Sequence, residues 1–521
     1  MQSYEKEIKE IMTKYKDNEY MLKRIDKYMT EILPNSMHSD FKLHEAKKTR
    51  ELKLLNDQSI FIQVFLIKNR LFFLPQTNTF YQYNGRDYKI IKIDDIIHSL
   101  LKSITNETEL VKNKHKIKNT VIKTIKERNL LSSIPDSCTI QSVIHKLALF
   151  HENKDIVKYL LIILGDCILK KNNFIFFTST STKRRIIYFE RQIRLYIGNV
   201  DISSYFITKY HDSHLFSKCR VLKIDREFSD DVWDNALSGD VINTICVSCH
   251  YSQRFNNSDD YLDSFDYEDE CRNCILFLKE KNKSDVFDFF CNTYFYTIET
   301  GDDITVGWKE VLYIWNYFLS ASGLPNIIHN SSLKTMMINH YKYDESGDVF
   351  FNISSQCLPI ATIVKDFWSS VIVHTENVDD ELELSELCLL LNKWLNENGR
   401  KNKVTYKLNE RVLLKVIEHF YNDLQVVSNK YICKIRCSLW DKAEDIDRSL
   451  DYTKGIMSNS LNDVKCISFD DLYHYYSAFT KQENKFVVSK YFHQKYLLRH
   501  IAKEFILFKS FVAFVKITYF Y

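Results

Sequence analysis

The stretch Trp308-Lys309-Glu310-Val311-Leu312-Tyr313-Ile314-Trp315-Asn316-Tyr317-Phe318-Leu319 sets the pattern for the second half of this chain. Its large apolar residues recur every three or four positions, which predicts a helix with an aromatic face. Residues 384–395 and 469–479 follow the same pattern. Three copies of one pattern predict three related structural units.

The copies also agree in their polar positions and in the segments that come after them. Each has an acid directly before an apolar residue, and these acids are Glu310, Glu386 and Asp471. A polar loop and a second amphipathic helix follow each copy, at residues 332–341, 409–420 and 489–501. In the first copy residues 343–351 read as a β-hairpin.

Helix, loop, helix and hairpin is the plan of a winged-helix unit, whose second helix can enter the major groove of DNA. The predicted second helices and the loops before them carry basic residues that could contact phosphates: Lys334, Lys403, Lys407, Arg411, Lys490 and Lys495. Two other interpretations remain open, namely a surface for protein docking and a scaffold of packed hairpins whose lysines only solvate the surface.

The first half of the chain mixes helical and strand-like patterns. Residues 1–57 predict a charged helical arm, and residues 59–66 and 70–74 are rich enough in β-branched and aromatic residues to predict strands. Residues 78–91 predict a hairpin with a type I′ turn at Asn84-Gly85, and a helix from Asp94 follows.

A run of basic residues lies between positions 112 and 126. A helix carrying Lys112, Lys114, Lys116 and Lys118 could line a phosphate backbone. The alternative is a solvated face, with the isoleucines and the valine of this run turned inward.

Two Cys-x-x-Cys pairs lie near the middle of the chain, Cys246 with Cys249 and Cys271 with Cys274. Four thiolates could hold a structural zinc ion. The flanking residues have helical spacing and lack the glycine and proline of zinc knuckles, which favours buried core cysteines. Zinc therefore stays a minor alternative, and no other cofactor is expected.

Length and composition bound the architecture. A chain of 521 residues with 45% hydrophobic residues predicts several domains, and ten glycines and five prolines indicate long helices and few tight turns. We expect a predominantly helical α+β protein. Its predicted parts are a helical arm (1–57), a small α/β domain (58–135), a mixed α/β middle domain (136–300), two winged-helix-like units (301–380 and 381–460), and a third helical unit with a C-terminal helix (461–521).

Several function classes find no support in the sequence. The net charge of +3 gives no global attraction to polyanions, so a nucleic-acid site would be a local patch. No apolar run is long enough to span a membrane, and thirteen scattered cysteines fit a reducing compartment. No P-loop, dinucleotide-binding or hydrolase motif occurs, so we expect no enzyme.

Short strings in the chain resemble proteins of mimivirus-type large DNA viruses. They are Ile163-Leu164-Gly165-Asp166-Cys167-Ile168-Leu169-Lys170-Lys171, Cys249-His250-Tyr251-Ser252-Gln253-Arg254-Phe255 with Ser258-Asp259-Asp260, Gly323-Leu324-Pro325-Asn326, Cys437-Ser438-Leu439-Trp440-Asp441-Lys442, and Val488-Ser489-Lys490-Tyr491-Phe492. Residues 81–104 and the three C-terminal units are similar to segments that flank the motor of poxvirus-type primase-helicases. The ATPase itself is absent, so this likeness implies association with nucleic acid and not unwinding or priming.

Together with the three helix-loop-helix copies and their lysines, these resemblances lead us to expect a non-enzymatic protein of viral replication or gene expression that binds nucleic acid, DNA rather than RNA. The expected location is the host cytoplasm, a viral factory or the virion, with other viral replication or virion proteins as further partners and no membrane association. The competing expectation is a structural or assembly protein of the virion or viral factory that acts through protein–protein contacts.

Overall fold

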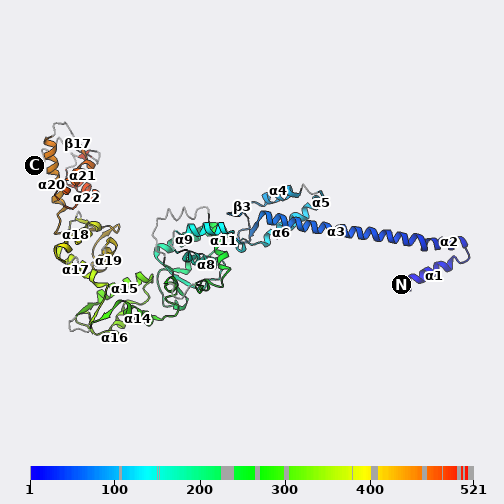
Figure 1. The fold of residues 1–521 in the computed structure, drawn as a ribbon, viewed down its shortest axis with the longest axis horizontal. Helices are drawn as coiled ribbons and strands as arrows, with labels where there is room; N and C mark the ends of the chain where they lie inside the picture. The colour runs from blue at the N-terminus through cyan, green and yellow to red at the C-terminus, as the bar shows by residue number, and fades with distance from the viewer. Residues whose placement is uncertain are drawn as a thin grey trace. The chain divides into compact units, whose positions relative to one another are not determined.

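The chain divides into two compact units in the computed structural model, residues 1–282 with 322–327, and residues 283–321 with 328–521 (Figure 1). The structure describes all residues except 1, 105–107, 149–150, 152, 224–239, 265–269, 299–303, 378–379, 400–408, 460–465, 484, 502–505, 508–510 and 514–521. The protein is mixed α+β, 64% helical and 12% strand, which confirms the predicted fold class.

The first unit begins with a series of helices, and the last of them is 37 residues long. These are α1 (Gln2–Lys14), α2 (Glu19–Lys27), a π-helical turn (Tyr28–Ile32) and α3 (Leu33–Asn69). The predicted strand at 59–66 is wrong, because these residues lie in α3. Phe61, Phe65 and Leu66 fall on one helical face and pack on the core, so burial of that face overrides their strand preference.

Three antiparallel strands and three helices complete the first core. They are β1 (Leu71–Leu74), β2 (Thr79–Tyr83), β3 (Tyr88–Ile91), α4 (Ile93–Ile104), α5 (Thr108–Val111) and α6 (Lys114–Glu127). The sheet order is β1-β2-β3, so the predicted hairpin is confirmed. Its turn is not type I′, because Tyr83 pairs with Tyr88 around a four-residue loop. The Asn84 side chain accepts hydrogen bonds from the backbone of Arg86 and Asp87, and Gly85 has the positive φ.

The second core of this unit is built on two helices in close contact. Its elements are α7 (Ser137–Leu147), α8 (Lys154–Ile168), β4 (Ile175–Phe177), α9 (Thr180–Ile197), β5 (Phe206–Ile207), β6 (Cys219–Val221), α11 (Val241–Ser252), α12 (Ser258–Leu262) and α13 (Glu270–Ile275). Strand β4 lies between β5 and β6, parallel to both. A Cβ atom on Gly165 would lie 2.2 Å from the Ser248 carbonyl oxygen, so this glycine lets the backbones of α8 and α11 approach.

Two strings that carried the viral resemblance meet at this contact. Gly165 and Asp166 on α8 face Ser248 and Ser252 on α11, and the Ser252 hydroxyl donates to Asp166 at 2.6 Å. Asp166 is buried, which raises its pKa to about 6. The two strings therefore form one packing contact of the core.

The second unit contains three copies of one topology, beginning with a copy at Lys283. Its elements are α14 (Lys283–Tyr294), β7 (Tyr296–Thr297), β8 (Thr305–Gly307), α15 (Trp308–Ser322), α16 (Asn330–His340), β9 (Tyr343–Asp344), β10 (Val349–Phe351) and β11 (Ile353–Ser354). The sheet order β8-β10-β9 places the first strand beside the outer strand of the hairpin, as in a winged helix. Phe290 of α14 packs edge-on to Trp315 of α15 at 4.9 Å.

The second copy repeats this arrangement with the sheet order β13-β15-β14. Its elements are α17 (Leu358–Val371), β12 (Ile372–His374), β13 (Glu381–Glu383), α18 (Leu384–Glu397), α19 (Glu410–Phe420), β14 (Val426–Val427), β15 (Tyr431–Cys433) and β16 (Ile435–Cys437). Strands β12 and β16 pair with each other outside that sheet.

The third copy has the sheet order β17-β19-β18. Its elements are α20 (Lys442–Asn459), β17 (Cys466–Ser468), α21 (Phe469–Gln482), α22 (Lys490–His500), β18 (Ile506–Leu507) and β19 (Phe511–Ala513). The expected C-terminal helix is wrong where the structure describes it, because residues 506–507 and 511–513 are strands. These strands complete the sheet of this copy.

The sequence predicted two winged-helix-like units and a third helical unit. The structure has three winged-helix-like copies, and each begins one helix earlier than the sequence pattern suggested. Helices α14, α17 and α20 are the first helices of the copies, at Lys283, Leu358 and Lys442. The sequence pattern identified only the second helix of each copy, because that helix carries the repeated acid and aromatic residues. The first helices differ from one another in composition and showed no repeat.

Candidate nucleic-acid interface

The repeated acids have a local structural role at the start of each second helix. Glu310 accepts a hydrogen bond from the backbone of Gly307 at 3.0 Å, and Glu386 accepts one from Glu383 at 2.8 Å. Asp471 accepts a hydrogen bond from the Ser468 hydroxyl at 2.6 Å. These bonds satisfy backbone or cap donors at helix starts, as in a capping box. The three acids thus explain the sequence repeat without implying an active site.

Helix α16 is the third helix of the first copy, and its predicted phosphate contact, Lys334, is engaged in an ion pair. Lys334 lies 2.9 Å from Asp348 on the wing, and its ammonium also sits over the Trp308 and Tyr343 rings. The wing turn itself carries Asp344 and Glu345. Because these carboxylates crowd the place where phosphates would approach, this copy offers a poor surface for DNA.

The third helix of the second copy, α19, packs against α15 of the first copy. His419 hydrogen-bonds through its ring to the Lys309 carbonyl at 2.7 Å, and the Lys309 ammonium donates to the Phe420 carbonyl at 2.8 Å. Tyr313 of α15 contacts the Phe420 ring at 5.5 Å. This end of α19 is therefore occupied by protein and cannot lie in a major groove.

Three predicted basic residues belong to the second copy. Arg411 is exposed on the first turn of α19. Lys403 and Lys407 lie outside the described residues. The loop before α19 thus stays a prediction.

The third helix of the last copy, α22, packs against the second copy. Lys495 forms an ion pair with Glu381 of β13 at 2.6 Å, and both side chains are largely buried. Tyr491 contacts the ring of Tyr431 on β15 at 5.7 Å. Lys490 pairs with Asp470 of its own copy at 2.8 Å. Two of the predicted DNA contacts are thus engaged within the chain.

A buried charge cluster lies where the second and third copies meet. Lys442, at the first position of α20, is 7% exposed and donates to the Glu381 carbonyl at 3.0 Å and to the Glu386 carboxylate. Its ammonium also lies 4.3 Å from the centre of the Phe492 ring. Burial lowers the pKa of Lys442, and the neighbouring carboxylates oppose that change. Sequence reasoning missed this cluster, because Lys442 is 56 residues from Glu386 and 61 from Glu381 along the chain, and no local pattern links them.

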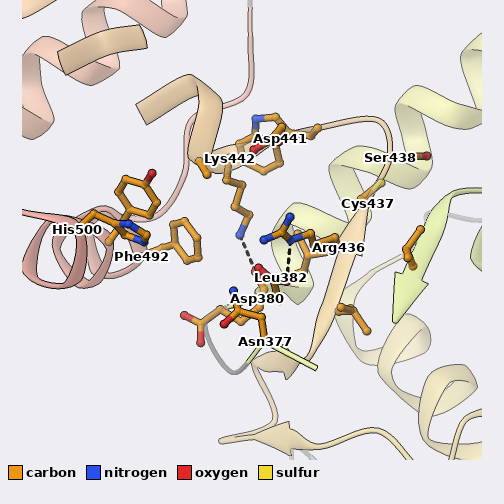
Figure 2. A pocket seen from close by; sticks show the side chains of 16 residues that line it. Asn377, Asp380, Leu382, Arg436, Cys437, Ser438, Asp441, Lys442, Phe492 and His500 are labelled. Carbon is orange, nitrogen blue, oxygen red and sulfur yellow. Dashed lines mark hydrogen bonds and ion pairs between the residues drawn. The ribbon is translucent and has the colours of Figure 1, made fainter. Parts of the chain in front are cut away.

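The cluster borders a cavity of about 390 Å³ (Figure 2). Figure 2 shows Lys442 and Phe492 reaching into it from one side, while Arg436 pairs with Asp380 on the other at 2.6 Å. Asp380, Glu381 and Asp441 line the cavity together with Arg436 and Lys442, so both signs of charge are present. It therefore lacks the single sign of charge that would attract a charged ligand.

Helix α6 of the first unit and the turn before it present their lysines differently. Ile117, Val121 and Ile125 are buried in the first core, as the alternative interpretation of this run expected. Lys112, Lys114 and Lys116 are exposed and Lys118 is half-buried. None of the four lies within ion-pair distance of a carboxylate among the described residues, so their charges are available to a partner.

The four cysteines in the middle of the chain do not form the zinc site that their spacing allowed. Cys246 and Cys249 are fully buried on α11, and burial raises the pKa of the Cys246 thiol to about 12. Cys271 and Cys274 are half-buried on α13. Across the described residues, no group of three or more metal-binding side chains is gathered. Cys246 and Cys249 are core residues, and a protonated thiol is a poor zinc ligand.

Comparisons with known proteins give no relative for this chain: no family model, no curated protein and no solved structure matches it. Among the described helices, none is long and apolar enough to cross a membrane.

Proposed function

We propose that the protein is a non-enzymatic nucleic-acid-binding protein whose phosphate contacts come chiefly from α6 and the turn before it, and not from the three winged-helix-like units. The observation that carries this proposal is the row of lysines from Lys112 to Lys118, which have no acidic partner in the described structure. Ile117, Val121 and Ile125 anchor the helix in the core, so the lysines are carried on a rigid element. The resemblance to proteins of large DNA viruses would place this activity in viral replication or gene expression, with DNA as the expected nucleic acid.

The row is local, which fits a chain with a net charge of only +3. A protein that binds through a few phosphates gains affinity by releasing counterions, so its binding weakens as salt rises. Each phosphate contact contributes a slope of about 0.9 in a plot of log affinity against log salt for duplex DNA. Binding through the four lysines therefore predicts a slope of roughly 3 to 4.

The proposal is tested by fluorescence polarisation with labelled duplex DNA, single-stranded DNA and RNA at about 50 to 200 mM salt. The variant Lys112→Glu/Lys114→Glu/Lys116→Glu/Lys118→Glu should lose most of the affinity and nearly all of the salt slope. The matched control is Lys154→Glu/Lys170→Glu/Lys209→Glu/Lys218→Glu, which changes the net charge equally at exposed positions of the same unit. Equal binding by both variants, or no binding by the unchanged protein at about 50 mM salt, would refute it.

A second candidate function is assembly through protein contacts, as a structural protein of the virion or viral factory. It is favoured by the packing of α19 and α22, each against the preceding copy of the second unit. In a DNA-binding winged-helix unit the corresponding helix enters the major groove, whereas here it makes a protein contact. This candidate predicts that the protein is stoichiometric in purified particles and has no affinity for nucleic acid. Quantitative mass spectrometry of such particles, combined with the polarisation assay, separates the two.

A further inference from the structure

Helix α6 turns one side to the core of its unit and the other side to solvent. Strand β1 and helices α3 and α4 pack against α6, and its three buried apolar residues lie on that side. On the opposite side, four exposed residues follow one another at intervals of three, four and three, so they form one line along the helix. We call this line the outward face of α6, and its residues are Lys116, Asn119, Lys123 and Lys126.

The row from Lys112 to Lys118 shares only Lys116 with the outward face. Lys118 comes seven positions before the buried Ile125, so it lies on the core side of the helix and is half-buried. Lys114 comes seven positions before the buried Val121 and is on the same side, but it is exposed as the first residue of the helix. These two lysines therefore do not point toward a partner that approaches the outward face.

The three lysines of the outward face keep their charge for a partner. None of them forms an ion pair within the part of the chain that the structure describes, and the one acid of α6, Glu127, is its last residue. The Lys126 ammonium lies 5.6 Å from the centre of the Phe73 ring, which favours its charged form. From Lys116 to Lys126 the face extends about 15 Å along the helix axis. This length corresponds to the rise of roughly four base pairs of duplex DNA.

The outward face offers little that could recognise bases. Helix α6 contains no Phe, Tyr or Trp, the rings on which proteins stack the bases of single strands. The hydroxyl of Thr120, next to the face, donates to the Lys116 carbonyl at 2.9 Å and is thus engaged within the helix. Lysine contacts to phosphates position a protein on a nucleic acid but carry no sequence information. The face therefore has the chemistry of a backbone contact.

We propose that the outward face of α6 binds the phosphate backbone of duplex DNA without reading its sequence, with Lys123 and Lys126 as phosphate contacts beside Lys116. This proposal rests on the function proposed above for α6. It extends the binding surface along the whole helix and gives Lys114 and Lys118 a smaller share of the binding. A duplex suits this face better than a single strand, because a duplex presents one negative charge per about 1.7 Å of its axis and needs no stacking rings.

The first test compares pairs of lysine substitutions in the full chain, by fluorescence polarisation with labelled duplex DNA at about 50 to 200 mM salt. Lys123→Gln/Lys126→Gln should lower the slope of log affinity against log salt by about 2, since each lost phosphate contact lowers it by about 0.9. Lys114→Gln/Lys118→Gln removes the same charge from the same helix and should lower the slope by less than about 1. The matched control is Lys154→Gln/Lys209→Gln, at exposed positions of the same unit, and it should leave the slope unchanged.

The outcomes separate this proposal from the function on which it rests. A fall in slope for Lys114→Gln/Lys118→Gln that equals or exceeds the fall for Lys123→Gln/Lys126→Gln would overturn the outward face. The function proposed for α6 would then stand, with the row as its contact. No binding by the unchanged protein at about 50 mM salt would refute that function itself. All replaced lysines except Lys118 are exposed, and urea denaturation of each variant verifies that it is folded.

The second test addresses the partner. The unchanged protein should bind two duplexes of equal length and different sequence with dissociation constants within about twofold of each other, because phosphates are the same in both. It should bind either strand alone more weakly, because the outward face has no ring for stacking. Tighter binding of a single strand would overturn the proposal. So would a preference of more than about tenfold for one duplex, since that is the cost of a mismatched base in sequence-specific binding.

Discussion

Helices α6 and α22 both carry lysines that the sequence suggested as phosphate contacts, and the structure treats the two sets in opposite ways. The lysines of α6 project from the first core without acidic partners among the described residues, whereas Lys490 and Lys495 of α22 are held in ion pairs. Helix α6 carries five lysines, whereas α22 carries two lysines and one arginine, and the residues packed beside the two helices differ. A row of lysines thus indicates a polyanion-binding site only where carboxylates of the same chain do not already form ion pairs with those lysines.

The largest expected loss of stability follows from breaking the buried charge cluster around Lys442, beside α22. Lys442→Met leaves the Glu386 carboxylate buried without its cation, and removal of one partner from a buried pair costs about 3–5 kcal/mol. Adding Glu386→Gln should recover most of this loss, because the amide oxygen can still accept the cap hydrogen bond from Glu383. Denaturation by urea measures both free energies of unfolding. A loss below about 1 kcal/mol in the single variant would show that the cluster is hydrated and not buried.

The next effect comes from a histidine on the buried face of α22. His493 is fully buried against Tyr473 and Tyr476, neither of its ring nitrogens has a hydrogen-bond partner among the described residues, and burial lowers its pKa to about 4. The unfolded chain therefore binds a proton more readily, so stability should fall as pH drops from about 6.5 to 4. The loss at pH 4 amounts to about 3 kcal/mol.

This pH dependence is checked by urea denaturation at about pH 7, 5.5 and 4. His493→Phe keeps a ring at this position and removes the titrating group, so the part of the slope between about pH 6.5 and 4 that belongs to this residue should vanish. Replacing exposed His115 on α6 by Phe is the matched control and should leave the slope unchanged. An unaltered slope in the His493→Phe variant would contradict the assignment.

The smallest expected loss of stability comes from replacing one lysine of α22, and comparing it with the same change on α6 tests how the two helices differ. Lys495→Ala leaves Glu381, which is 8% exposed, without its cation and should cost about 1–3 kcal/mol. Lys116→Ala on α6 removes a solvated side chain and should change stability by less than about 0.5 kcal/mol. Thermal denaturation of the two variants side by side gives the comparison. Equal shifts would mean that α22 is not packed as the structure shows.

The sequence predicted the repeated helices of the fold better than it predicted the segments outside them. Apolar spacing located the second and third helices of every copy, because these helices bury a regular face. It misread residues 59–66, where a β-branched run lies in a helix, and residues 506–513, where the described residues are strands that complete a sheet. In both cases a distant element selects between two local structures that the residues can adopt.

Periodicity within single elements was enough to predict the three copies, the hairpin after α3 and the inward face of α6. Tertiary packing, in contrast, controls which lysines have partners, because the carboxylates that pair with Lys442 and Lys495 are more than fifty residues away along the chain. Packing also settles the role of the first cysteine pair, since burial keeps the Cys246 thiol protonated. Local patterns fix how a segment folds, whereas the availability of a charge depends on what the rest of the chain places beside it.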